Sequence, residues 1–230
     1  MLVNLININK YYNGKHILKN INLTVNEKDR IGLIGINGCG KTTLLRILTG
    51  KELPDRSTEK DGIVSFASKT SVGYLEQMSG LDRDSTVIDE MKSVFSYLDS
   101  VLERMKELEH IMKESSEINE EISEEYSKLS AYYESNDGYT IDVKIKTILN
   151  GMGFSENNYN RIISGFSGGE KTRLAIAKLL LEEPNLLILD EPTNHLDFKT
   201  VLWLEEYLKD YKGALLIVSH DRYFLDKVVT

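Results

Sequence analysis

The sequence predicts an α/β fold with a parallel-sheet core, an antiparallel β subdomain before it and an inserted helical hairpin. Three observations lead to this prediction. Two N-terminal segments alternate apolar and polar residues, as half-buried strands do. Two later segments, Leu186–Leu189 and Ala214–Val218, are continuously apolar, as strands buried on both faces are. Between these two groups lies a long stretch with a heptad repeat.

The segments before residue 76 form the expected β-rich start of the domain. Asn13–Lys15 is a polar turn between two alternating segments, which indicates a hairpin. A third, short apolar segment leads directly into a glycine-rich loop, after which a helical pattern begins. In chain order we predict three strands, a helix and a further strand at Leu2–Ile8, Ile17–Leu23, Arg30–Ile34, Thr42–Thr49 and Val72–Leu75.

The middle of the chain carries a coiled-coil seam. Eight apolar residues recur at alternating intervals of four and three, as heptad a and d positions do: Val87, Met91, Val94, Leu98, Val101, Met105, Leu108 and Met112. At about 1.5 Å per residue, they predict a helix of roughly 40 Å. After the polar link Lys113–Glu117, a second helical stretch runs to a stop signal at Asn136–Gly138, with apolar residues at Ile118, Ile122, Tyr126, Leu129 and Tyr133. We predict an antiparallel hairpin; a solvated pair that only packs on the domain is the other reading.

Charge is concentrated in that hairpin. The 230 residues carry a net charge of −8, and Asp99–Asp137 alone holds twelve acidic and four basic residues, so the rest of the chain is neutral. This balance argues against a general polyanion binder. The chain is therefore expected to be a neutral body with one acidic arm.

Composition excludes several classes of protein. Hydrophobic residues make up 41% and charged residues 28%, the balance of a soluble globular domain. No apolar run approaches the ~20 residues of a membrane span, and the N-terminus lacks the features of a secretory signal. The single cysteine, Cys39, allows no internal disulfide and no cysteine-based zinc site. We therefore expect a cytoplasmic protein without membrane insertion.

A phosphate-binding loop is the strongest motif. Gly35–Thr43 reads GINGCGKTT and matches GxxxxGK[ST] between a strand and a helix. Glycines let consecutive backbone N–H groups turn inward, and the helix N-terminus adds its positive dipole. Lys41 is expected to reach the β- and γ-phosphates and the Thr42 hydroxyl to ligate Mg²⁺. The loop contributes eight candidate binding residues: Gly35, Asn37, Gly38, Cys39, Gly40, Lys41, Thr42 and Thr43.

Paired carboxylates end a later apolar strand. Asp190 and Glu191 follow Leu186–Leu189 at the carboxyl end of that strand, where ligands of open α/β sheets gather. Asp190 suits the Mg²⁺ shell, and Glu191 suits polarising the water that attacks the γ-phosphate. Such a strand end is common on its own, but together with a phosphate loop it predicts hydrolysis of a nucleoside triphosphate.

Further motifs give the chain a family resemblance. GFSGGEKTRLAIAKLLL, whose helix we predict at Gly168–Glu182, resembles the signature motif of ATP-binding cassette (ABC) ATPases, and DEPTNHLD follows it at the usual distance. Gln77 in GYLEQ is similar to the Q-loop, Asn194–Asp197 to the D-loop, and His220 in SHDR to the switch histidine. The resemblance implies an ABC-type P-loop NTPase fold, with ATP and Mg²⁺ as ligands.

The resemblance also assigns roles to individual residues. Beyond the loop, it implies nucleotide contacts from Tyr12, Gln77, Ser167, Gly168, Gly169 and Glu170. It implies catalytic roles for Lys41, Glu191 and His220, and Mg²⁺ ligation by Thr42, Gln77 and Asp190. The family places an adenine-stacking aromatic at Tyr12, with the adjacent Tyr11 as the alternative. In the family the signature closes on the nucleotide of another cassette, so hydrolysis is expected to need two cassettes.

Three features resemble the ABC-F subfamily of soluble twin-cassette proteins. EPTNHLD and the ending SHDRYFLD are similar to its motifs, and its first cassette carries a helical arm between the Q-loop and the signature. The resemblance implies binding to the ribosome near the tRNA exit site, to influence translation or protect against antibiotics. The acidic arm is expected to meet basic ribosomal proteins or to stand in water, because RNA contact favours Lys and Arg. The alternatives are the ATPase subunit of a membrane transporter and an ATP-binding assembly module without turnover.

We predict one ABC ATPase domain over residues 1–230. Its parts are residues 1–85 (β subdomain and phosphate-loop core), 86–138 (hairpin arm), 139–185 (helical and signature region) and 186–230 (the rest of the core). The chain ends ten residues after His220. We therefore expect a truncated first cassette, whose partner is either the other half of a longer protein or a second copy.

Overall fold

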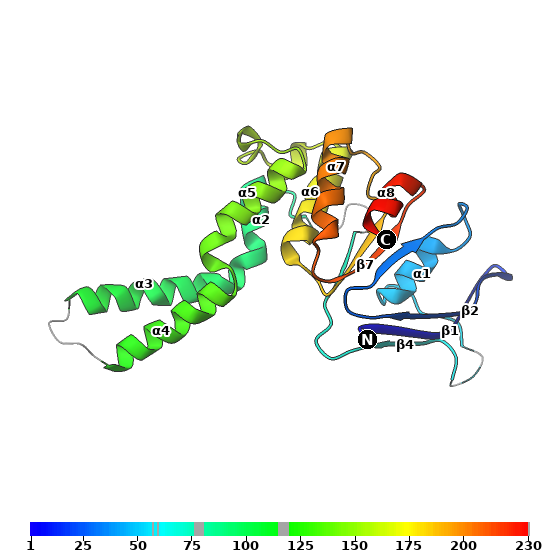
Figure 1. The fold of residues 1–230 in the computed structure, drawn as a ribbon, viewed down its shortest axis with the longest axis horizontal. Coiled ribbons are helices and arrows are strands. Elements are labelled where there is room, and N and C mark those ends of the chain that lie inside the picture. The colour runs from blue at the N-terminus through cyan, green and yellow to red at the C-terminus, as the bar shows by residue number, and fades with distance from the viewer. Residues whose placement is uncertain (57, 59, 76–80, 115–119, 230) are drawn as a thin grey trace. The chain divides into compact units, whose positions relative to one another are not determined.

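The computed structural model describes residues 1–56, 58, 60–75, 81–114 and 120–229 (Figure 1). The chain divides into two compact units, one of residues 1–80 and 166–230 and the other of residues 81–165. These bounds differ from the four-part division expected from the sequence, which stays a prediction. Among the described residues, no helix combines the length and the apolar character that crossing a bilayer requires.

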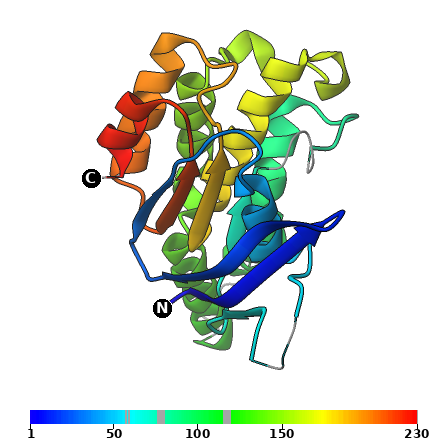
Figure 2. The ribbon, with the colours of Figure 1, turned by 90° about the vertical axis from the view of Figure 1, so that its right-hand side faces the viewer.

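The first unit contains a three-stranded antiparallel sheet in the order β2-β1-β4. Its strands are β1 (Val3–Tyr12), β2 (Lys15–Val25) and β4 (Ile63–Phe66). β1 and β2 lie side by side (Figure 2) and are joined by Asn13 and Gly14, whose φ angles of 48° and 78° suit a two-residue type I′ turn. The N-terminal hairpin expected from the sequence is therefore present.

Both long strands extend further than the sequence pattern predicts. The register between β1 and β2 shifts at three places, and Asn7 and Asn20 have positive φ angles of 49°. Such bulges place consecutive residues on one face and so break the alternation that marks a strand in a sequence. The strand β4 lies outside the prediction.

The first unit also contains a four-stranded parallel sheet in the order β3-β7-β6-β5. The strands are β3 (Arg30–Leu33), β5 (Val72–Tyr74), β6 (Leu186–Asp190) and β7 (Ala214–Val218). The central strands β6 and β7 are buried along nearly their whole length, which explains their continuous apolar sequences. The predicted α/β fold is confirmed, and because the strands are parallel, the ends of β3 and β6 meet at one edge.

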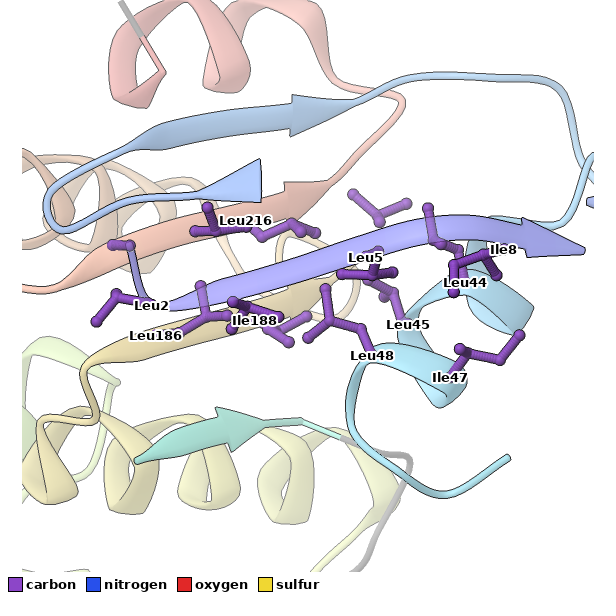
Figure 3. Close-up of a cluster of buried hydrophobic side chains, with 14 of the residues drawn as sticks. Leu2, Leu5, Ile8, Leu44, Leu45, Ile47, Leu48, Leu186, Ile188 and Leu216 are labelled. Carbon is purple, nitrogen blue, oxygen red and sulfur yellow. The ribbon is translucent and has the colours of Figure 1, made fainter. Parts of the chain in front are cut away.

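Helix α1 (Lys41–Leu48) joins the two sheets into one core. Figure 3 shows the side chains of β1, α1 and β6 that meet there, among them Leu5, Ile8, Leu45, Leu48, Leu186 and Ile188. Each fully buried Leu or Ile side chain contributes about 1.5–3 kcal/mol relative to an exposed one. The helix that follows the phosphate loop is therefore held firmly against both sheets.

The described part of the first unit contains three more helices, and each begins at a capping side chain. They are α6 (Gly168–Glu182), α7 (Phe198–Lys209) and α8 (Arg222–Val228). The side chains of Ser167, Asp197 and Asp221 accept hydrogen bonds from backbone N–H groups of the first turns. Helix α6 has the predicted bounds, whereas α7 and α8 lie outside the prediction.

The second unit is built of helices. In chain order they are α2 (Val87–Lys92), η1 (Ser93–Leu98), α3 (Asp99–Glu114), α4 (Glu120–Ser135), η2 (Gly138–Thr140), α5 (Ile141–Gly151), η3 (Glu156–Asn158) and η4 (Ile163–Gly165), where η denotes a 3₁₀ helix. Helices α3 and α4 pack side by side in opposite directions (Figure 1). The predicted antiparallel hairpin is present, although Ile118 and part of the link lie outside the described residues.

The long first helix of the hairpin, however, is interrupted. η1 separates α2 from α3, and it buries Phe95 in place of Val94, which is only half-buried. The backbone N–H of Val87 donates to the carbonyl oxygen of Arg161 at 3.1 Å, which ties α2 to the far end of the unit. A heptad pattern does not report such long-range bonds, so the helix of roughly 40 Å was a wrong expectation. The arm consists of α3 and α4.

The seam between α3 and α4 allows a direct stability test. Met105 is 3% exposed and packs with Leu98 and Tyr133. We expect Met105→Ala to lower the unfolding free energy of the arm by about 2 kcal/mol or more, seen as faster amide hydrogen exchange in α3 and α4. Met112, on the same helix but 41% exposed, is the matched control, and its replacement by Ala should change protection by under about 0.5 kcal/mol. Equal effects of the two substitutions would contradict the buried seam.

Candidate functional site

Residues far apart in the sequence line one pocket of about 360 Å³ in the first unit. The lining comes from the ends of β1 and β6, the start of β2, the phosphate loop and α1: Tyr12, Ile17, Asn37, Gly38, Gly40, Lys41, Thr42, Thr43, Asp190 and Glu191. All of these except Ile17 are candidate site residues from the sequence. The structure therefore brings the phosphate loop and the paired carboxylates together.

The loop needs glycine at two positions of the pocket wall. Gly38 and Gly40 have φ angles of 78° and 104°, a region that L side chains rarely adopt. A Cβ on Gly40 would also lie only 2.9 Å from side-chain atoms of Ile17 and Leu18 in β2. Gly40 thus lets the loop turn into α1 while lying directly against β2.

This close approach predicts a large effect of a single methyl group. Gly40→Ala combines a strained φ with an overlap, so we expect it to lower the unfolding free energy by about 2 kcal/mol or more in thermal or urea unfolding. Gly50 has a φ of 73°, and a Cβ there would meet nothing within 4 Å. Gly50→Ala is therefore the control for φ strain alone, about 1 kcal/mol. If both variants lose the same stability, the contact with β2 is unimportant.

Lys41 is held at the loop by the loop's own backbone. Its Nζ donates to the carbonyl oxygens of Gly35 at 2.7 Å and of Ile36 at 3.2 Å. Gly35 and Cys39 do not line the pocket; a Cβ on Gly35 would lie 2.7 Å from the Cys39 sulfur, so the two residues pack on each other. Their predicted contacts with a nucleotide stay predictions. Lys41, in contrast, lines the pocket.

Asp190 ends β6 beside the loop threonine. Thr42 Oγ1 donates to Asp190 Oδ2 at 3.4 Å. Burial raises the pKa of Asp190, and the neighbouring Glu191 charge adds to this, while the Thr42 hydroxyl and the Lys41 charge oppose it. A cation placed between Thr42 and Asp190 would relieve the burial cost of the carboxylate.

The donors at this edge fit Mg²⁺. Among the described residues, no cluster of three or more His, Cys, Asp or Glu side chains forms a metal cage. Mg²⁺ does not need one, because it keeps several waters and takes one or two protein oxygens together with substrate phosphates. Thr42 Oγ1 and Asp190 Oδ2 are such oxygens. Gln77, the third predicted ligand, lies outside the described residues.

Glu191 is held in an unusual backbone conformation beside His220. Its φ is +50°, and its N–H donates to the carbonyl oxygen of Val218 at 2.8 Å. Its Oε2 accepts a hydrogen bond from the backbone N–H of His220 at 3.3 Å. Its Oε1 is buried and accepts no hydrogen bond from the described residues, although His220 Nε2 comes to 3.2 Å. Glu191 also lines the pocket, so its carboxylate is placed to act on a molecule bound there.

His220 also reaches the phosphate loop. Its Nε2 lies 2.9 Å from Asn37 Oδ1, which connects two residues that are 183 positions apart in the chain. His220 does not line the pocket, but both of its contacts, Asn37 and Glu191, do. The structure therefore brings the predicted switch histidine to the edge of the same site.

The structure separates the two candidate aromatic residues. Tyr12 lines the pocket; its hydroxyl donates to the Glu52 carboxylate, and Lys10 Nζ lies 5.6 Å from its ring centroid. That hydrogen bond and burial raise the pKa of Tyr12. Tyr11 stacks instead on His16, with ring centroids 4.0 Å apart and 11° between the planes. Of the two rings, Tyr12 is therefore the one at the pocket, and its predicted contact with a nucleobase stays a prediction.

The signature residues lie outside the pocket. Ser167 caps α6 in a capping box, in which its Oγ accepts from the Glu170 N–H at 3.3 Å and Glu170 Oε2 accepts from the Ser167 N–H at 2.9 Å. A Cβ on Gly169 would lie 3.5 Å from His195 of the D-loop segment. None of the residues from 167 to 170 lines the pocket. Their contact with a nucleotide stays a prediction.

Sequence reasoning missed Ile17. It lies in β2, and its side chain borders both Gly40 and the pocket. The alternating pattern places Ile17 on a strand but does not show which loop that strand meets. No sequence signal could have marked it as a site residue.

Comparison with known proteins identifies the kind of domain. The family described as "ABC transporter" matches residues 18–194. YdiF of Bacillus subtilis (strain 168) is 46% identical over 230 residues, which are 100% of this chain and 35% of YdiF. The tylosin resistance ATP-binding protein TlrC of Streptomyces fradiae is 36% identical (96% of this chain, 40% of TlrC), and the energy-dependent translational throttle protein EttA of Escherichia coli (strain K12) is 35% identical (93% and 37%). The chain thus spans well under half of each of these relatives.

Solved structures show the same fold. An ATP-binding subunit of an ABC transporter superposes with a TM-score of 0.68 at 19% identity, covering 99% of this chain and 83% of that one. The dimeric MJ0796, a bacterial ABC transporter cassette, gives a TM-score of 0.63 at 22% identity, covering 99% and 91%. These likenesses establish the cassette fold.

Proposed function

The chain belongs to the ABC transporter family, and from this premise we propose that it is an ABC-F-type cassette that binds and hydrolyses ATP and acts on the ribosome. The observation that carries the ATPase proposal is the single pocket shared by the phosphate loop and the pair Asp190–Glu191. The ribosomal proposal is supported by the helical arm, by the strings EPTNHLD and SHDRYFLD, and by the relatives TlrC and EttA.

The pocket supplies the groups that ATP hydrolysis needs. The N–H groups of the loop and the α1 N-terminus bind the β- and γ-phosphates, and Lys41 moves from the loop carbonyl oxygens to donate to them. A water loses its proton to the Glu191 carboxylate, its oxygen bonds to the γ-phosphorus, and the bond to the bridging oxygen breaks to leave ADP and phosphate. Bound at Thr42 and Asp190, Mg²⁺ would neutralise phosphate charge. Tyr12 would stack on the base.

Turnover is proposed to need a second cassette. The signature lies outside the chain's own pocket, and Ser167 stands at the N-terminus of the 15-residue helix α6, whose dipole favours a phosphate. MJ0796, which shares the fold, is described as dimeric. The partner is either a second copy or another part of a longer protein. Turnover per molecule that rises with concentration of this chain would support pairing of copies, and turnover independent of concentration would count against it.

Sedimentation with ribosomes tests the proposed site of action. The chain is mixed with purified bacterial ribosomes and either ATP or ADP, and the pellet is assayed. We expect more of the chain in the pellet with ATP than with ADP, and no ATP-dependent gain for Lys41→Ala. Equal pelleting with and without ribosomes would contradict the ribosomal role while leaving ATP binding untouched.

The ATPase subunit of a membrane transporter is the second candidate, because the matching family carries that description. Such a subunit couples to its membrane partner through the region near the Q-loop. In this chain an acidic helical pair, α3 and α4, follows Gln77 in the sequence. We therefore favour the ribosome, and the sedimentation experiment separates the two.

A further inference from the structure

Three chain segments meet at the His220 ring. Asn37 comes from the phosphate loop, Glu191 follows β6, and His220 follows β7. His220 Nε2 lies 2.9 Å from Asn37 Oδ1 and 3.2 Å from Glu191 Oε1. The predicted roles of these residues as nucleotide ligand, base and switch do not account for the contact between Asn37 and His220.

The contact fixes where a proton lies on the ring. Both oxygens near Nε2 are acceptors, since an amide Oδ1 and a carboxylate oxygen carry no proton to donate. Nε2 must therefore carry the hydrogen. Because Glu191 Oε1 accepts no hydrogen bond from the described residues, this N–H is directed to Asn37. The amide thereby sets both the tautomer and the orientation of the ring.

We propose that Asn37 is a positioning residue that holds the His220 ring, protonated on Nε2, against Glu191 in the nucleotide-free cassette. Because the Nε2 hydrogen goes to Asn37, the Glu191 carboxylate accepts, among the described residues, only the hydrogen bond from the backbone N–H of His220. Because Asn37 also lines the phosphate pocket, an incoming γ-phosphate competes with the amide for the same N–H. This last step rests on the proposed function, whereas the anchoring itself does not.

The chain contains a second histidine–asparagine pair in which the same two atoms lie at the same distance. His16 Nε2 lies 2.9 Å from Asn9 Oδ1 in the β1–β2 hairpin, and neither residue lines the pocket. This pair is a matched internal control. A variant that loosens the whole fold would change the ring tautomer of both His220 and His16. Loss of the specific hydrogen bond to Asn37 would change the tautomer of His220 alone.

The test is ¹⁵N NMR of the histidine rings in the full, nucleotide-free chain, with peaks assigned through His220→Gln and His16→Gln. In the wild type we expect His220 to show the fixed Nε2–H tautomer. In Asn37→Ala we expect the averaged shifts of a freely exchanging ring at His220 and no change at His16. In Asn9→Ala we expect averaged shifts at His16 and no change at His220. A wild-type His220 with averaged shifts, or an unchanged His220 in Asn37→Ala, would overturn the proposal.

Asn37→Asp keeps an acceptor at the same place and covers the case in which the Ala variant does not fold. It should retain the fixed Nε2–H tautomer at His220, and averaged shifts there would overturn the proposal.

A second experiment tests whether a γ-phosphate competes with Asn37 for the His220 N–H. The β,γ-imido analogue of ATP with Mg²⁺ should move the wild-type His220 peak, and ADP should not. If calorimetry shows that the analogue binds but the His220 peak does not move, the proposed competition between the γ-phosphate and Asn37 is wrong. If the analogue does not bind at all, the proposed function fails, and the anchoring result stands independently.

Discussion

Glu191→Gln is expected to lower ATP turnover by about 10²- to 10⁴-fold while ATP affinity stays within about twofold of wild type. The amide has nearly the shape of the carboxylate but cannot take a proton from water, and general-base catalysis is worth about that factor. Glu191 lines the pocket, so its carboxylate is the group that would take this proton. We also expect the variant to trap the ATP-bound, paired state, because pairing is retained and hydrolysis is not. Steady-state phosphate release and nucleotide-binding assays on the same preparation measure the two effects.

Glu206→Gln is the matched control. Glu206 is an exposed carboxylate on α7 that pairs with Lys209 at 2.5 Å and does not line the pocket. Its replacement should leave both turnover and affinity unchanged. Wild-type turnover in Glu191→Gln, measured under conditions where the wild-type protein is active, would show that another group accepts the proton.

Lys41→Ala is expected to weaken ATP binding itself, by about 10- to 100-fold. A hydrogen bond to a charged group contributes about 1.5–3 kcal/mol, and each 1.4 kcal/mol is about tenfold in affinity. Lys41 is the only lysine among the residues that line the pocket, and its Nζ is held by two loop carbonyl oxygens, from which it can reach a phosphate. Fluorescence titration with a labelled ATP analogue and Mg²⁺ measures the loss.

Two further variants define what the lysine supplies. Lys209→Ala removes an exposed lysine from α7 and should leave affinity unchanged. Lys41→Arg keeps the positive charge but carries a planar fork in place of a compact ammonium group, so we expect only partial recovery. Full affinity in Lys41→Ala would mean that the loop N–H groups and α1 bind the phosphates without the lysine.

The fold was predictable where a sequence pattern is long or chemically distinct. The bounds of α6 and β7 match the prediction because a capping box and a continuous apolar run mark them. The split between α2 and α3 was not predictable, since it depends on packing of Phe95 and on backbone bonds to residues more than 70 positions away. Helices α7 and α8 could have been found, because Asp197 and Asp221 each stand immediately before them as capping residues.

The site was predictable to the extent that it consists of contiguous motifs. The phosphate loop and Asp190–Glu191 each carry their chemistry in a short string, and the parallel sheet brings their strand ends to one edge. Which of Tyr11 and Tyr12 lines the pocket needed the structure, because adjacent residues of a strand face opposite sides and the sequence does not say which side holds the pocket. The contact between Asn37 and His220 also needed it, since no local pattern reports a hydrogen bond across 183 residues.

Calorimetric titration of the folded chain with ATP and Mg²⁺ tests the central claim most directly, namely that the loop around Lys41 and the end of β6 form one nucleotide site. The account predicts saturable heat with one ATP per chain, weaker binding in Lys41→Ala and a dependence on Mg²⁺ that Asp190→Ala removes. No uptake of ATP by a chain that circular dichroism shows to be folded would contradict it.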